Sequence, residues 1–138
     1  MIVARKLDAL QRCLRRIETR RPQDVETPRA DLDLQDVLVL NLSRAVQICV
    51  DLAAHLITDL PLPPPDTIGL ASDYLEQGGI LDAELALRMK KTVGFRNIAA
   101  HAYDTIDCNI MFAIATTHLG DFRAFARVMA GRLSESET

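Results

Sequence analysis

The chain has 138 residues, 49% of them hydrophobic and 25% charged, which suits one globular core of ordinary size and excludes a disordered chain. The formal net charge is −3, and charged residues break up the apolar residues near the N-terminus, so a secretory signal is not expected. We therefore expect a single domain over residues 1–138, located in the cytoplasm and without membrane contact.

The first predicted helix is marked by apolar residues that recur at spacings of four and three. These residues are Val3, Leu7, Leu10, Leu14 and Ile17. The segment from 20 to 30 contains two prolines and few apolar residues, and is expected to be a connection.

A second, longer helix is expected to begin near Asp31 or Asp33, because a carboxylate favours the positive N-terminal end of a helix, and to run to about Thr58. Its predicted core stripe is Leu38, Leu42, Ala45, Cys49, Leu52 and Leu56. Four residues on another side form a polar stripe with Ile48 in its middle: Asn41, Arg44, Asp51 and His55.

The remaining elements are also predicted to be helices. The proline run at 61–65 cannot be helical, a short third helix is expected to end at Gly78-Gly79, and Asp82 is expected to cap the fourth. A fifth helix is expected from Asp104 or Thr105 onward, with a bend at Gly120. Since no alternating strand pattern occurs, the predicted fold is all-α, an antiparallel bundle of about five helices.

Basic residues gather in two places in spite of the negative total. Residues 1–30 hold eight of the sixteen basic residues, and a second cluster leads toward residue 96 (Arg88, Lys90, Lys91 and Arg96). Such patches can attract RNA phosphates, although a solvated helix face explains the N-terminal cluster equally well. Aromatic residues make up only 4% of the chain, so any contact with RNA should rely on its backbone.

Four polar residues interrupt the alanine-rich end of the fourth helix: Arg96, Asn97, His101 and Tyr103. At about 100° per residue, Asn97 and His101 share one helical stripe, while Arg96 and Tyr103 share a neighbouring one. A guanidinium binds phosphate, and an imidazole titrates near neutral pH, so this group suits work on a phosphodiester. Capping of the last carbonyls of a helix is the structural alternative.

This pattern resembles the R-x4-H-x-Y signature of the HepT-like toxins, ribonucleases of the HEPN superfamily. The run Asn41 to Gln47, followed by Asp51 to Ile57, is similar to that family's long second helix. The resemblance implies a helical fold and a metal-independent endoribonuclease that needs no cofactor. It also implies a toxin–antitoxin pair, in which Arg96 and His101 define the catalytic signature and Asn97 is the polar residue that commonly follows the arginine.

RNA cleavage needs both a base for the 2′-hydroxyl and an acid for the leaving 5′-oxygen, and one imidazole cannot do both at once. We therefore expect a homodimer whose two copies of the motif face one cleft. Arg96 is expected to bind the scissile phosphate, Asn97 to orient the histidine or the phosphate, and Tyr103 to donate a further hydrogen bond to the phosphate. In toxins that this chain resembles, the matching tyrosine accepts AMP from a minimal nucleotidyltransferase antitoxin. The resemblance thus implies that Tyr103 is a modification site.

Other groups of polar residues give further predictions. Asp51 and His55 stand four residues apart, and they are interpreted as a second acid–base couple, as part of the motif's supporting shell, or as an ordinary contact on the helix surface. His118 is expected to be a partly buried core residue. No Glu-x-x-His pair suggests a di-metal centre, and the three cysteines are expected to be reduced packing residues. The alternative function is a non-catalytic helical module that binds a nucleotidyltransferase or a nucleotide.

Overall fold

The computed structural model describes the backbone of residues 2–21, 31–57, 73, 75–77, 79–101, 112–113 and 115–137. Side chains are described for the same residues except at positions 2, 57, 93, 95–101 and 133–137. Within these residues the long elements are α1 (Ile2–Arg20), α3 (Leu32–Ile57), α5 (Ala83–His101) and α7 (Leu119–Glu137), and no strand occurs among them. The predicted all-α fold is confirmed.

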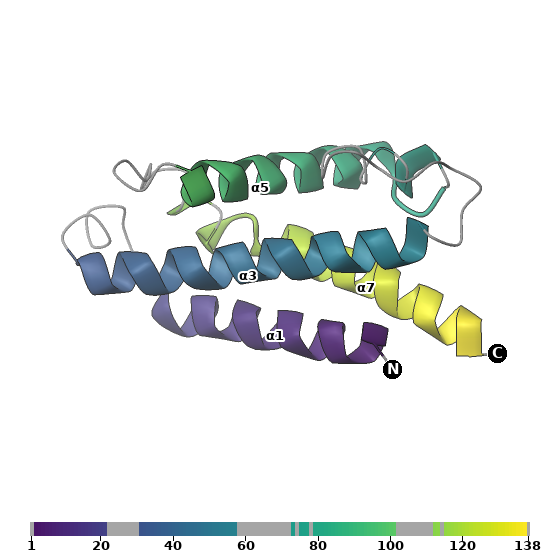
Figure 1. Cartoon of the computed structure of the whole chain (residues 1–138), viewed down its shortest axis with the longest axis horizontal. Helices are drawn as coiled ribbons and strands as arrows, with labels where there is room; N and C mark the ends of the chain where they lie inside the picture. Colours follow the sequence, from purple (N-terminus) through teal and green to yellow (C-terminus); the bar gives the residue numbers. More distant parts are fainter. Residues whose placement is uncertain are drawn as a thin grey trace.

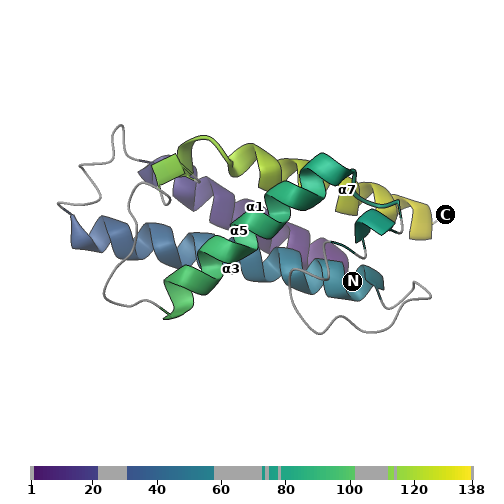
Figure 2. The same ribbon diagram turned by 90° about the horizontal axis from the view of Figure 1, so that it is seen from above.

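The long helices run antiparallel in chain order, with α5 on one side of α3 and α1 on the other (Figure 1). Seen from above, α5 crosses obliquely over α3 and α7 (Figure 2). The most extensive packing is between α1 and α3, and α7 contacts each of the other long helices. Helix α5 therefore lies on one face of the bundle, whereas α1 lies on the opposite face.

The core consists of the predicted stripes of α1 and α3 together with residues of α5 and α7. Leu10, Ile17, Leu38, Leu42 and Phe122 are each fully buried. At about 25 cal/mol per Å² of apolar surface, each such side chain contributes roughly 1.5–3 kcal/mol on burial. The helices are thus held mainly by apolar contacts.

Local capping explains where α3 and α5 begin. The Asp31 carboxylate accepts a hydrogen bond from the Leu34 amide at 3.1 Å, and the Asp82 carboxylate accepts one from the Leu85 amide at 2.8 Å. Each bond satisfies an amide that has no partner inside its helix. Both capping predictions are confirmed.

A Schellman turn precedes α5. The Gly79 amide donates to the Glu76 carbonyl at 3.0 Å, the Ile80 amide donates to the Leu75 carbonyl at 2.9 Å, and Gly79 has a φ of 74°. A side chain would strain that conformation, so glycine is favoured there. The predicted stop is confirmed at Gly79, while Gly78 lies outside the described residues.

The bend predicted at Gly120 is placed differently in the structure. The amides of Thr117 and His118 both donate to the Ala113 carbonyl, at 2.8 and 3.2 Å, which ends the preceding helical residues 115–116. The chain then turns, and α7 begins at Leu119 with Gly120 already inside the helix. The prediction was wrong in its position, because the turn lies at residues 117–118, before Gly120.

By length and composition, residues Leu32–Leu56 of α3 could cross a membrane. The apolar stripe of this helix, which includes Leu42, Ala45 and Leu52, is buried inside the bundle. Packing in a core accounts for such a composition as well as a membrane does.

Candidate active site

Helix α5 carries most of the polar signature. It continues without a break to His101, so Arg96, Asn97 and His101 occupy two successive turns of one helix, as predicted. Their side chains and all of Tyr103 lie outside the described residues. The backbone therefore fixes the register of three of the four signature residues.

The described part of α5 shows which helical stripe faces the bundle. Leu85, Met89 and Thr92 are 7%, 3% and 5% exposed and follow one another at spacings of four and three. Arg96 is the next position on this stripe, whereas His101 is turned about 140° away from it. The two positions of the signature pair thus belong to different faces of α5.

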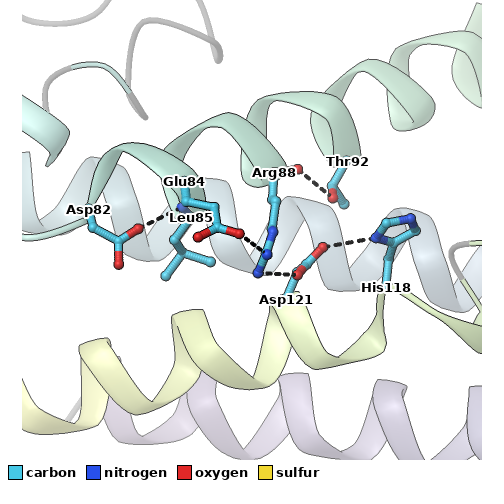
Figure 3. A network of polar contacts seen from close by, with 7 residues as sticks. All are labelled: Asp82, Glu84, Leu85, Arg88, Thr92, His118 and Asp121. Atoms are coloured by element: carbon cyan, nitrogen blue, oxygen red, sulfur yellow. Dashed lines mark hydrogen bonds and ion pairs between the residues drawn. The ribbon is translucent and has the colours of Figure 1, made fainter.

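A polar network joins α5 to the start of α7 (Figure 3). Arg88 pairs with Glu84 one turn earlier, and its guanidinium also lies 3.5 Å from the carboxylate of Asp121. The second Asp121 oxygen lies 3.1 Å from Nδ1 of His118. Asp121 is only 10% exposed in its side chain, while Arg88 and His118 are each 47% exposed. This network ties α5 to α7 two turns before Arg96.

The exposed position of His118 differs from the partly buried core residue expected. Because α7 begins immediately after it, the imidazole reaches across the first turn to Asp121 and does not enter the core. Two features of the sequence could have indicated this: the spacing of three between His118 and Asp121, and the preference of carboxylates for the first turn of a helix.

The predicted supporting residue Asp51 connects α3 to α1. Its carboxylate accepts hydrogen bonds from Lys6 Nζ at 2.8 Å and from Gln47 Nε2 at 2.9 Å. Its side chain is 37% exposed, so the bond to Lys6 is well screened by water. These contacts describe a link between two helices, and the catalytic support suggested for Asp51 stays a prediction.

The two predicted basic clusters differ in how far they are neutralised. On α5, Arg88 pairs with Glu84 and Asp121, and Lys90 pairs with Asp73. On α1, Lys6 pairs with Asp51. Five exposed arginines of the same helix have no carboxylate partner among the described residues: Arg5, Arg12, Arg15, Arg16 and Arg20. Unneutralised positive charge within the described residues is therefore concentrated on α1.

Two of the three cysteines are buried, free thiols, as predicted, and Cys108 lies outside the described residues. Burial raises the pKa of Cys49, and it raises the pKa of Cys13 against the opposing effect of Arg16, Arg44 and Arg12. Both thiols are thus neutral packing groups at neutral pH. No group of three His, Cys, Asp or Glu side chains placed to hold a metal ion occurs among the described residues.

Comparison with known proteins assigns the family. The model of the family described as "Ribonuclease HepT-like" matches residues 10–129. The chain belongs to the HepT-like ribonucleases. It is 32% identical, over 93% of its own length and 96% of the relative, to an mRNA nuclease HepT of Shewanella oneidensis. The family match and this relative support endoribonuclease activity for the chain.

Solved structures of similar chains agree with the helical bundle. One is a tri-AMPylated HEPN toxin of Shewanella oneidensis in complex with an MNT antitoxin, with a TM-score of 0.87 and 32% identity, covering 94% of this chain and 97% of that one. Another is a toxin–antitoxin structure with AMP-PNP, with a TM-score of 0.85 and 31% identity, covering 93% and 97%. The findings favour a HEPN toxin of HepT type over a non-catalytic helical module.

Proposed function

We propose that this HepT-like ribonuclease cleaves RNA without a metal ion, in a cleft shared by two copies of the chain, with Arg96 and His101 as the catalytic residues. The observation that carries the proposal is the match to the ribonuclease family, and the unbroken α5 keeps Arg96 and His101 five residues and about 140° apart on a single helix. The family match supports RNA cleavage as the reaction, and the continuous helix supports the spacing of these two residues.

In the proposed reaction a base removes the proton of the 2′-hydroxyl, and the 2′-oxygen attacks the adjacent phosphorus. The bond from phosphorus to the 5′-oxygen breaks, and an acid protonates that oxygen, leaving a 2′,3′-cyclic phosphate and a 5′-hydroxyl. One His101 acts as base and the His101 of a second copy acts as acid, since a single imidazole cannot hold both states at once. Arg96 stabilises the charge that develops on the phosphate, and Asn97 orients the imidazole or the phosphate.

The test is incubation of the purified protein with RNA in excess EDTA, with detection of 2′,3′-cyclic phosphate ends. We expect full activity in EDTA, and a loss of at least a hundredfold in Arg96→Ala and in His101→Ala proteins that remain folded. Thr92→Val is the matched control, because Thr92 lies on the same helix and its hydroxyl donates to the Arg88 carbonyl within that helix. Parent-like cleavage by both alanine variants contradicts the assignment of the site, and loss of cleavage in EDTA contradicts metal independence.

The shared cleft requires a homodimer, which sedimentation of the pure protein measures directly. A monomer that retains full activity at the same concentration contradicts the shared cleft. We further propose that the protein works in the cytoplasm as one domain over residues 1–138, in keeping with charged residues throughout α1 and with the buried free thiols of Cys13 and Cys49.

Regulation by a nucleotidyltransferase antitoxin is proposed on the basis of the AMPylated relative. The Tyr103 phenol would attack the α-phosphorus of ATP, form a phosphodiester with AMP and release pyrophosphate, and the added charge would block the cleft. Incubation with the cognate antitoxin and labelled ATP should modify the parent and not Tyr103→Phe. Equal labelling of the two proteins contradicts Tyr103 as the acceptor.

A further inference from the structure

A groove runs between α1 and α7 and encloses about 410 Å³. Its floor is apolar and includes Leu7, Leu14 and Ala126, while three arginines stand along it, Arg15 on α1 and Arg123 and Arg127 one turn apart on α7. Since α1 and α5 lie on opposite sides of α3 (Figure 1), the groove is separate from the helix that carries the nuclease signature.

The charge of this groove is mostly unneutralised. Arg123 pairs with Glu18, which leaves Arg15 and Arg127 exposed and without a carboxylate partner among the described residues. Helix α1 has six basic and two acidic side chains, a net charge of +4, in a chain whose formal net charge is −3. The groove thus combines two guanidinium groups that no described carboxylate neutralises with a helix whose net charge is positive, although the net charge of the whole chain is negative.

We propose that this groove binds a stretch of the RNA substrate away from the bond that is cleaved. Arg15 and Arg127 bind phosphates of the strand, and the apolar floor lies against its ribose and base faces. An RNA strand fits better than an acidic protein segment, because the chain already acts on RNA and needs phosphate contacts to hold it. With only 4% aromatic residues the chain has little capacity for base stacking, so guanidinium–phosphate contacts must supply the affinity.

The experiment compares two double variants that each remove two positive charges. Arg15→Ala with Arg127→Ala removes the free arginines of the groove, while Arg5→Ala with Arg16→Ala removes exposed arginines of α1 that do not line it. Because all four side chains are exposed, neither variant should unfold, and circular dichroism confirms this. The charge-matched pair separates a local contact from general attraction, which is screened beyond about 8 Å at physiological salt.

The probe is a single-stranded 2′-O-methyl RNA, which lacks the attacking hydroxyl, so binding is measured without cleavage. For the groove variant we expect binding about fivefold to tenfold weaker. The slope of log K against the logarithm of the salt concentration should be shallower by about 1.4, which corresponds to two lost phosphate contacts on a single strand. The control should change affinity by less than about twofold and leave the slope nearly unchanged. In cleavage assays the groove variant should raise KM for long RNA, leave kcat unchanged and leave cleavage of a short oligonucleotide unaffected.

Equal effects of the two double variants overturn the proposal, because they show attraction by net charge alone. Unchanged RNA binding, with or without weaker binding of the antitoxin, also overturns it, and weaker antitoxin binding would assign the groove to a protein. The inference rests on RNA being the substrate and not on the roles proposed for Arg96 and His101. Since the probe is not cleaved, failure of those roles leaves the binding result intact.

Discussion

Replacement of Asp121 by alanine tests whether the network between α5 and α7 stabilises the protein. The carboxylate faces Nδ1 of His118 at 3.1 Å and a guanidinium nitrogen of Arg88 at 3.5 Å, and both partners are 47% exposed. At that exposure each contact is worth about 0.5–1 kcal/mol after screening. We expect Asp121→Ala to lower the free energy of unfolding by about 1–2 kcal/mol.

The loss should stay below the roughly 3–5 kcal/mol typical of a broken buried ion pair. Arg88 keeps its contact with Glu84 and its access to water, so no uncompensated buried charge remains after the substitution. Asp121→Asn retains an acceptor oxygen of the same shape and should cost about half as much. The exposed Asp8 on α1 serves as the control, with Asp8→Ala expected to change stability by less than about 0.5 kcal/mol.

The assay is urea unfolding followed by circular dichroism at equal protein concentrations, because dimerisation would couple stability to concentration. Thermal unfolding should show a fall in Tm of roughly 3–8 °C for the alanine variant. A change below about 0.3 kcal/mol would show that the network adds nothing to the packing of α5 on α7. A loss above about 3 kcal/mol would show that Asp121 compensates a charge more deeply buried than the contacts indicate.

Three further predictions concern the core and the link between α1 and α3. Phe122→Ala removes a fully buried side chain and should cost about 3–5 kcal/mol in urea unfolding, and a loss below about 1 kcal/mol would contradict tight packing there. Lys6→Met removes the half-exposed contact with Asp51 and should cost less than about 1 kcal/mol in the same assay, and a larger loss would contradict screening by water. Because burial raises the pKa of Cys49, its thiol stays protonated up to alkaline pH. Alkylation of Cys49 at pH 8, measured by peptide mass spectrometry, should therefore be at least about tenfold slower in the folded protein than in urea. Equal rates would contradict the burial of this thiol.

Short-range features of the sequence determined much of the fold. The helical period of the apolar residues predicted which side of α1 and α3 is buried, and the carboxylates of Asp31 and Asp82 predicted where helices begin. These predictions succeed because period and capping act within about one turn of the chain. The spacing of Arg96, Asn97 and His101 was likewise readable, since a continuous helix fixes their relative angles.

Only the tertiary structure decided which charges are neutralised. The contacts of Arg88 with Asp121 and of Lys6 with Asp51 join residues that are 33 and 45 positions apart, and both depend on how the helices cross. The same crossings place Arg15 and Arg127 along one groove and leave His118 exposed, neither of which follows from the period of a single helix. Residue spacing thus set the faces of each helix, while the packing of one helix on another determined which of those faces meet.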